Sequence, residues 1–424
     1  MKRISVLLIA SLAVVLSGSS PAEGSETLTP EALLPLHNRK DAYTPAMAYG
    51  KEGCLVVWQS GRTGEGSMVK SLLYGADLVA CRVDMNGKPL DKEPIVLSSA
   101  TDLQEKPHLA FGDNLFLAVW QDLRNGKDYD IYAARVTPEG KVLDKEGILV
   151  SGLPHNQCIP KVAWDGKAFQ VVWQDFRSNV SYEIYGARVS TTGKVLDPEG
   201  VLLKKRFTSR SGGSRYSPAI ASRGEGKSLV LWCSHWRGGN SGGVMVEEGQ
   251  VVDEDANTFA GRNIKTDGPN WVSHPIALAA GPDGFLASWM SFVPGGRGGG
   301  TRDSNAMVLD KSGKHMKYLF LAGKQHYIRQ SDVIWDGSAY SAGWIERIVV
   351  KRGQAPHDAV FLTRISQQGE PVGPVHAMAG TFESPASKPT VATDGKGTTF
   401  IAYERHPKTG DVPIKIAFRL LRAK

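Results

Sequence analysis

The sequence has few cysteines and none of the common metal-binding spacings. Its four cysteines, Cys54, Cys81, Cys158 and Cys233, are too few and too scattered over 424 residues for a disulfide-based scaffold. It has no Cys-x-x-Cys pair, no histidine pair at a helical metal spacing and no EF-hand-like loop. We therefore predict no metal and no cofactor. One disulfide stays open, because Cys54 and Cys81 fall on consecutive predicted strands that hairpin pairing could place opposite each other.

Long hydrophobic runs are also scarce. The run at residues 6–16 is too short to span a bilayer comfortably. It follows Lys2 and Arg3 and precedes small residues at 17–22, which is typical of a secretory signal peptide. No cysteine lies near it, which disfavours lipid attachment. We therefore predict a signal peptide at 1–22 and one soluble domain at 23–424, without a membrane span, periplasmic or secreted.

The excess of positive charge is small. The formal net charge is +7, or +5 once Lys2 and Arg3 are removed, and the isoelectric point is near 9.0. This balance somewhat favours an anionic partner. It is equally compatible with the ordinary surface charge of a soluble protein. We expect no nucleic-acid partner and a monomer.

What the sequence does contain is a repeat, clearest at residues 160–197, where four short apolar runs are separated by turn residues. An aromatic residue ends the second run of each unit, and neighbouring copies are 53 to 62 residues apart. These residues are Trp58, Trp120, Trp173, Trp232, Trp289, Trp344 and Tyr403. Seven units at this period predict an all-β fold, a seven-bladed β-propeller of four-stranded blades. Six blades with an appendage is the alternative.

The turns predict two unlike faces. Short turns such as Asp165-Gly166, Asn86-Gly87 and Glu248-Gly249 join the first strand to the second and the third to the fourth. They must share one face, because successive strands alternate in direction. The other connections are long and differ between units, and such loops usually carry function. The last unit ends after its third strand, and residues 31–36 resemble the fourth-strand segments at 147–150 and 200–203. The N-terminal segment is therefore expected to complete the seventh blade.

Three polar residues are expected at the mouth of the central channel. His108, Lys161 and Asp332 each follow the residue that opens the first strand of a unit. They could form a polar binding site there. The competing interpretation is a solvated rim that needs only water.

Arginines follow the marker aromatics. Arg62, Arg124 and Arg177 come four residues after theirs, and Arg237 five residues after Trp232. Arginine forks bind carboxylates and sulfates, so several on one face could bind an acidic polysaccharide. A structural role competes, in which the Asp and Arg of Trp-Gln-Asp-x-Arg lock the hairpin to Asp130 or Glu183.

A third group of candidates is expected in the face loops: His235, Trp271, His274, Tyr327 and Arg329. Aromatic rings stack on sugars, and a histidine beside a tyrosine or arginine could abstract a proton next to a uronate carboxylate. The alternative is that each is an ordinary loop residue.

Residues 120–136 and 173–189 both read Trp-Gln-Asp-x-Arg followed by Ile-Tyr-x-Ala-Arg-Val. These units resemble the TolB-like propeller repeats of exported bacterial proteins. The resemblance covers about residues 30–424 and is strongest in the first three units; 243–246 lacks the Ile-Tyr signature. It implies a propeller fold, export, and a role in binding a protein or ligand, and it supplies no catalytic residues. We expect a module that binds a protein or an acidic glycan on its variable-loop face. The alternative is a carbohydrate-active enzyme, a lyase or hydrolase of an acidic polysaccharide.

Overall fold

The computed structural model describes residues 26–38, 40–61, 75–203, 213–224, 226–236, 244–252, 260–262, 271–294, 300–322, 327–348, 356–407 and 413–423. The predicted signal peptide and its cleavage region lie outside these ranges. All of the regular elements in the described ranges are β-strands. None of these ranges holds a helix long and apolar enough to cross a membrane.

The strands of the first half form antiparallel sheets in chain order. One sheet contains β3 (Ala42–Tyr49), β4 (Gly53–Ser60), β5 (Asp77–Asp84) and β6 (Ile95–Ser98). The next contains β7 (Gln104–Gly112), β8 (Leu115–Asp122), β9 (Asp130–Val136) and β10 (Ile148–Ser151). Then come β11 (Gln157–Trp164), β12 (Phe169–Asp175), β13 (Glu183–Val189) and β14 (Val201–Leu202). The fourth contains β15 (Gly213–Gly224), β16 (Lys227–Trp236), β17 (Val244–Val252) and β18 (Ala260–Arg262).

The second half continues in the same way. Its first sheet contains β19 (Trp271–Gly281), β20 (Gly284–Pro294), β21 (Gly300–Asp310) and β22 (His315–Ala322). The next contains β23 (Tyr327–Trp335), β24 (Tyr340–Ile348), β25 (His357–Ile365) and β26 (His376–Ala379). The last contains β27 (Ala386–Thr393), β28 (Thr398–Arg405) and β29 (Lys415–Arg422), with β1 (Thr27–Leu28) and β2 (Ala32–Leu33) both paired to β29.

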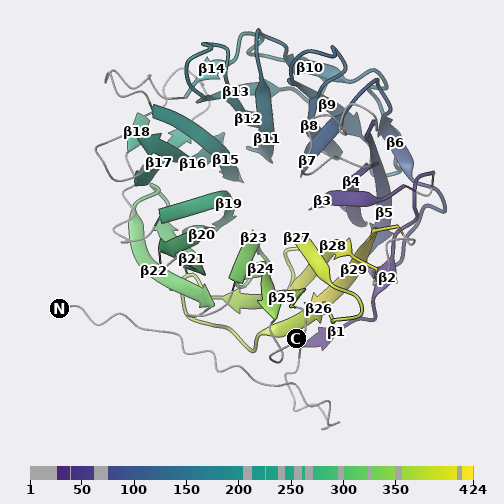
Figure 1. Ribbon diagram of the computed structural model, residues 1–424, viewed down its shortest axis with the longest axis vertical. Helices are drawn as coiled ribbons and strands as arrows, with labels where there is room; N and C mark the ends of the chain where they lie inside the picture. The colour runs from purple at the N-terminus through teal and green to yellow at the C-terminus, as the bar shows by residue number, and fades with distance from the viewer. Residues whose placement is uncertain are drawn as a thin grey trace.

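The first strands of the sheets surround a common axis (Figure 1). They contact one another in the order β3, β7, β11, β15, β19, β23 and β27, and β27 contacts β3 again. Within the described ranges the chain thus forms six four-stranded sheets and one five-stranded sheet arranged in a ring. The prediction of an all-β propeller with four-stranded blades is confirmed.

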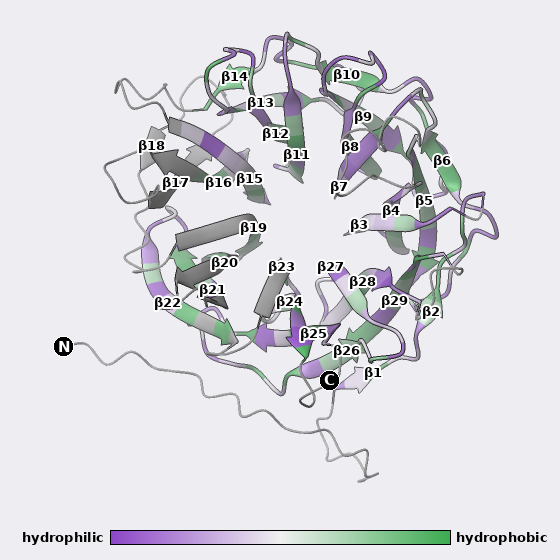
Figure 2. Cartoon of the chain, viewed as in Figure 1, coloured by the Kyte–Doolittle hydropathy of each residue, from purple (hydrophilic) through white to green (hydrophobic). Residues whose placement is uncertain are grey.

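Apolar second strands explain why the sheets pack face to face. The marker aromatics lie on β4, β8, β12, β16, β20, β24 and β28 and are at most 2% exposed. The larger clusters of buried side chains each span two neighbouring sheets; Leu55 and Val57 of β4, for example, pack with Phe116 and Trp120 of β8. A strand covered on both faces buries its residues on both. The innermost strands β7 and β11, by contrast, combine hydrophilic with hydrophobic residues (Figure 2).

The turns largely follow the prediction. Gly87, Gly140 and Gly193 adopt φ of 84°, 87° and 85° in the hairpins between third and fourth strands, a region that favours glycine. The turn predicted at Glu248-Gly249 is wrong, because both residues lie inside β17, whose pairing with β16 runs through them.

A repeated ion pair holds the same hairpin in the first three sheets. Arginine from the third strand makes bidentate contacts with the aspartate nine residues later, at 2.7 to 2.8 Å for the closest atoms. The pairs are Arg82–Asp91, Arg135–Asp144 and Arg188–Asp197. Each aspartate also accepts the backbone N–H of its arginine. These contacts explain why Ala-Arg-Val and Gly-Lys-Val-Leu-Asp recur together in the sequence.

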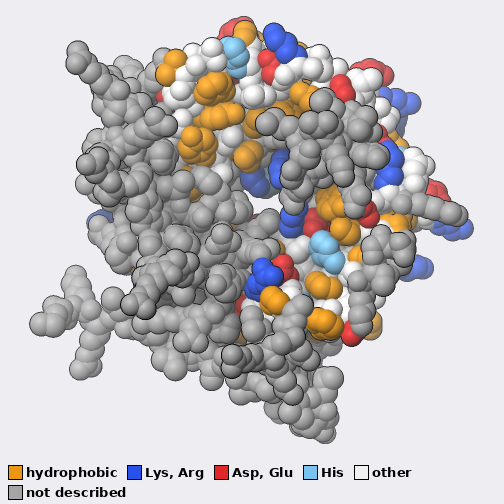
Figure 3. Space-filling view, in the orientation of Figure 1, with side chains coloured by type: hydrophobic (Ala, Val, Ile, Leu, Met, Phe, Trp, Pro, Cys, Tyr) orange, Lys and Arg blue, Asp and Glu red, His pale blue; other side chains and the backbone are white. Residues whose placement is uncertain are grey.

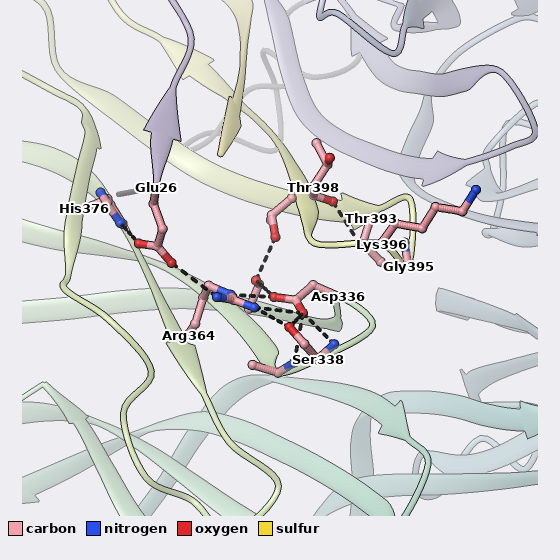
Figure 4. Close-up of polar contacts among 12 residues, drawn as sticks. Glu26, Asp336, Ser338, Arg364, His376, Thr393, Gly395, Lys396 and Thr398 are labelled. Atoms are coloured by element: carbon pink, nitrogen blue, oxygen red, sulfur yellow. Dashed lines mark hydrogen bonds and ion pairs between the residues drawn. The ribbon is translucent and has the colours of Figure 1, made fainter. Parts of the chain in front are cut away.

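The N-terminal segment is bound by the last two sheets of the chain. Glu26, at the start of the described chain, points between His376 and Arg364, which also holds Asp336 (Figure 4). Arg364 Nε lies 2.7 Å from Asp336 Oδ2 and is buried with it. Farther along the segment, the Tyr403 hydroxyl donates a hydrogen bond of 2.6 Å to Glu31. This network therefore has its donors and acceptors matched internally.

The Cys54–Cys81 disulfide, which the sequence left open, is not formed. Both cysteines are free and buried. The register of β4 and β5 places Cys54 opposite Val83 and Cys81 opposite Val56, so the two thiols are offset along the hairpin. Burial raises the pKa of both thiols, which keeps them in the unreactive protonated form.

Candidate functional site

A bulge opens the innermost strand at one end of the channel. Most of the first strands contain a proline near their start. In five of them the residue before that proline has a left-handed backbone, with φ of 48° to 54°. These residues are Thr44, Lys106, Ile159, Ser217 and Lys388. The pairing register shifts at the same place in each strand. Such backbone costs about 1–3 kcal/mol for a non-glycine residue and persists only where its surroundings hold it.

The preceding sheet holds these bulges. Gln121 Oε1 accepts the backbone N–H of Ile159 at 3.0 Å, and Gln174 Oε1 accepts that of Ser217 at 3.1 Å. Both glutamines follow a marker tryptophan. The glutamine of Trp-Gln-Asp-x-Arg therefore connects one sheet to the first strand of the next.

The bulge determines which residue follows it in the channel. His108 lies opposite Val119 in the pairing of β7, and Lys161 opposite Val172 in β11. Asp332 occupies the equivalent place in β23, opposite Gly343. In β19 the equivalent residue is Ala277, which pairs with Ser288. The sequence pattern, counted from Pro275, had pointed to the residue before it.

His108 supports the neighbouring first strand. Its Nδ1 accepts the backbone N–H of Val162 at 3.2 Å. Burial, reinforced by the nearby charge of Lys161, lowers the pKa of His108 well below its ordinary value of 6.5. The ring is therefore neutral at physiological pH, and its proton is on Nε2, because Nδ1 is an acceptor.

Asp332 has the same role between β23 and β27. Its Oδ2 accepts the backbone N–H of Val391 at 2.9 Å and the Thr390 hydroxyl at 3.0 Å. Its Oδ1 accepts the N–H of Val333 at 3.0 Å. Burial raises the pKa of Asp332, opposed by these hydrogen bonds and by the charge of Lys161. Both carboxylate oxygens are thus occupied by donors of the protein.

Lys161 differs from both. Burial lowers the pKa of its ammonium, Asp332 opposes this shift, and Lys106 adds to it. No hydrogen bond or ion pair joins the Lys161 side chain to any residue in the described ranges. Its side chain is partly exposed to the channel, while protein atoms surround it closely enough to desolvate the charge. The structure thus brings His108, Lys161 and Asp332 into electrostatic contact, and no described residue bonds the ammonium.

The face of the disc drawn in Figure 3 has a hollow at its centre. Lys and Arg side chains border this hollow on its described side, and acidic side chains lie close by (Figure 3).

Arg124 and Arg177 are committed to internal contacts. Arg177 makes two side-chain bonds to Asp175, at 2.6 and 2.9 Å, and its guanidinium lies 3.7 Å over the Tyr185 ring. Arg124 makes the same contacts with Asp122 and Tyr132. The lock predicted from the motif exists, but its expected partners are wrong.

Asp130 and Glu183 have other partners. Asn125 donates to Asp130 at 3.1 Å, and Glu183 pairs with the buried Arg215. The Asp–Arg lock of Trp-Gln-Asp-x-Arg therefore does not use these two carboxylates.

The remaining predicted residues give less information. Arg62 and Arg237 lie outside the described residues. The backbones of His235, Trp271, His274, Tyr327 and Arg329 lie in strands β16, β19 and β23 instead of loops, and their side chains are outside the described part.

A polar cluster beside the channel in the last sheet was not predicted. Glu404 Oε1 accepts the backbone N–H of Thr44 at 2.8 Å, as the glutamines do elsewhere. Its Oε2 accepts the Ser387 hydroxyl at 2.9 Å and lies 3.2 Å from His406 Nε2. Burial raises the pKa of Glu404, but His406, Lys388 and the Thr44 amide outweigh it and the net shift is downward. The available signal was glutamate at the glutamine position after Tyr403.

This cluster does not form a serine–histidine–carboxylate relay. His406 Nε2 lies 2.7 Å from the Ser387 hydroxyl and also faces Glu404. A relay needs the carboxylate on the other ring nitrogen, where it can orient the base. The cluster therefore supports the bulge at Thr44 and is no nucleophile site.

No family model matches the chain, and no curated protein matches it. Among solved structures, a protein of unknown function from Dyadobacter fermentans is 13% identical, with a TM-score of 0.52 over 94% of this chain and 99% of that one. An α-L-arabinanase from Penicillium chrysogenum, complexed with arabinobiose, is 9% identical over 92% and 98%, with a TM-score of 0.49. A sialidase from Trypanosoma rangeli is 10% identical over 93% and 59%, with a TM-score of 0.48. At these identities the likeness to the Dyadobacter protein concerns the fold alone.

Proposed function

We propose that this protein is an exported binding module that takes an anionic group of an acidic glycan into the mouth of its central channel. The observation that carries the proposal is the ammonium of Lys161. It is partly desolvated, and no described acceptor binds it. An unpaired charge in such a place is costly unless something compensates for it. A ligand carboxylate would provide that compensation.

The surroundings favour an anion over a cation. Lys106 is exposed and lies close enough to Lys161 to disfavour its charge. The carboxylate that faces Lys161, Asp332, already accepts three hydrogen bonds from protein donors. A ligand anion would thus meet two ammonium groups and no unoccupied carboxylate from Asp332.

A glycan is favoured over a protein partner by the form of the site. The charge lies on an innermost strand just after its bulge and is partly exposed there, which suits a single projecting group better than a broad surface. An arginine-lined outer surface would suit a broad partner better, but Arg124 and Arg177 are occupied by contacts within the protein. We retain the enzymatic alternative, a lyase or hydrolase of an acidic polysaccharide, as an outcome of the test.

Three finer expectations are part of the proposal. We count the five-stranded sheet as a seventh blade completed by the N-terminal strands, a count supported by the pairing of β1 and β2 with β29. The TolB-like type is supported by the repeated Trp-Gln-Asp-x-Arg motif. Export and a monomeric state are supported by the sequence of the first 22 residues and by the repeat pattern.

The test is calorimetric titration with oligogalacturonate, compared with its methyl ester, at fixed ionic strength. We expect the acid to bind, the ester to bind at least tenfold more weakly, and Lys161→Met to lose at least tenfold in affinity. Lys88→Met, on an exposed hairpin, is the matched control and should bind as the wild type does. Equal affinity of the Lys161 variant would refute the proposal. Growth of absorbance from unsaturated sugar ends during the titration would establish the lyase alternative.

A further inference from the structure

His108 offers the channel a hydrogen bond of fixed polarity. We propose that His108 binds the ligand as a neutral donor through Nε2–H, next to the ammonium of Lys161, and is the residue that specifies a deprotonated carboxylate acceptor. The inference rests on the proposed function for its ligand. What it adds is a specificity role for a histidine that carries no charge.

The backbone of the next sheet fixes this polarity. Val162 N–H points at His108 Nδ1 from 3.2 Å, so Nδ1 must present a lone pair. Placing a proton on Nδ1 would set two N–H groups against each other and remove the acceptor of that amide. Leaving a buried amide unpaired costs about 1–3 kcal/mol. The remaining proton is therefore held on Nε2, and the ring resists becoming a cation.

The same support recurs elsewhere in the ring, which argues that it is built into the fold. Asp332 accepts the N–H of Val391 at 2.9 Å. Val391 follows Thr390, which is the first residue after the bulge in β27. In the same way, Val162 follows Lys161 in β11. At these two positions the side chain thus accepts the first-strand amide of the following sheet. Only an acceptor can do so, and the histidine can do so only as its Nε2–H tautomer.

Nε2 is available to a ligand. The described residues give it no hydrogen-bond partner, and it is not among their enclosed, unpartnered polar atoms. The charged groups around the ring are Lys161 on β11, the exposed Lys106 on its own strand, and Asp332 on β23, which acts through Lys161. Burial and the charge of Lys161 oppose a positive charge on His108, so its Nε2–H remains a donor.

This arrangement makes the ligand requirement specific. The carboxylate offers one oxygen to Nε2–H and its charge to Lys161. An ester keeps an acceptor but loses the charge, and an ammonium sugar offers neither. Because His108 stays neutral, affinity does not increase as the pH falls through the usual range of histidine titration. A site that used a histidinium would bind anions more tightly at low pH.

The first test does not require the ligand. Two-dimensional nuclear magnetic resonance of the full chain labelled with ¹⁵N-histidine reports which ring nitrogen carries the proton. We expect His108 to show the Nε2–H form from pH 5 to pH 8. The His108→Gln spectrum assigns the signal. An Nδ1–H form, or a protonated ring at pH 6, would overturn the inference whatever the protein binds.

The second test measures oligogalacturonate affinity at pH 5, 6.5 and 8. We expect changes of less than threefold across this range. We expect His108→Gln, which keeps an N–H donor and an acceptor, to stay within about fivefold of the wild type, and His108→Phe to lose at least tenfold. A tenfold gain at pH 5, or full affinity of a folded His108→Phe variant, would refute the role of His108. Loss of binding by Lys161→Met but not by His108→Phe would preserve the proposed function and reject only this inference.

Discussion

Replacing Asp175 by alanine tests whether the Trp-Gln-Asp-x-Arg motif is structural. Asp175 is 1% exposed. It accepts Trp173 Nε1–H at 2.8 Å, two side-chain bonds from Arg177 at 2.6 and 2.9 Å, and the Arg177 backbone N–H at 2.8 Å. The substitution removes all four acceptor contacts and leaves a guanidinium near the core edge. We expect a clear loss of stability without a change of fold.

The magnitude can be divided between the two partners. Trp58, Trp232 and Trp344 have no acceptor for Nε1 within the described residues, so the fold tolerates an unpaired indole at this position. Most of the cost must therefore come from Arg177, whose side chain is only 18% exposed. Removing one partner of such a pair costs about 3–5 kcal/mol when it is fully buried, so we expect on the order of 2–4 kcal/mol here.

Urea unfolding followed by tryptophan fluorescence measures this loss. The double variant Asp175→Ala with Arg177→Met removes the orphaned charge, so it should recover part of the stability lost by Asp175→Ala alone. Asp175→Asn keeps one acceptor for the indole and should fall between the wild type and the alanine variant. A loss below about 1 kcal/mol for Asp175→Ala, or a double variant that is less stable than the single one, would refute this account.

Three further results are expected. Gly112→Ala should lower the melting temperature markedly, because its Cβ would lie 2.1 Å from the Trp164 ring, whereas Gly343→Ala, with 3.4 Å to its nearest neighbour, should change it little; equal effects would contradict the packing. Burial, with the charge of a neighbouring aspartate, raises the pKa of Asp130 from 3.8 to about 6, so the native state carries a penalty above pH 6 that disappears below pH 4. Asp130→Asn should therefore stabilise the protein by on the order of 1–2 kcal/mol at pH 7 and not at pH 4, as measured by denaturant unfolding; a gain that does not depend on pH would reject this cause. Because burial lowers the pKa of Lys161 below 10.5, binding of oligogalacturonate should weaken on the alkaline side sooner than an ordinary lysine would allow; an unchanged affinity up to pH 10.5 would show that the ammonium is not used.

The repeated strands and turns of this protein could be predicted from its sequence, because each sheet of a propeller has the same residue types at the same places. The aromatics that end the second strands recur at fixed places and are all buried, and most of the predicted hairpin glycines lie in turns. Where the repeat weakens, prediction weakened as well. Gly249 looked like a turn residue, but the register of β16 and β17 carries the strand past it.

Contacts between sheets could not be predicted from the sequence in the same way. Gln121 and Ile159 are 38 residues apart, and only the packing of one sheet on the next brings them together. The arginines were hard to predict for a similar reason. The sequence suggested Arg177 as a ligand-binding residue, but only the structure shows that Arg177 is paired with Asp175. Composition tells which residues can bind an anion, and packing decides which of them remain available.

That distinction makes Lys161 the residue on which the proposed function rests. The residue after the bulge of a first strand is either small, as Ala46 is, or accepts the amide of the next sheet, as His108 and Asp332 do. Lysine has no acceptor and is far larger than alanine, so structure alone gives no reason for it. A residue that breaks a local rule without an internal compensation is where a functional requirement should be sought. In the function we propose, that requirement is an anion supplied from outside the chain.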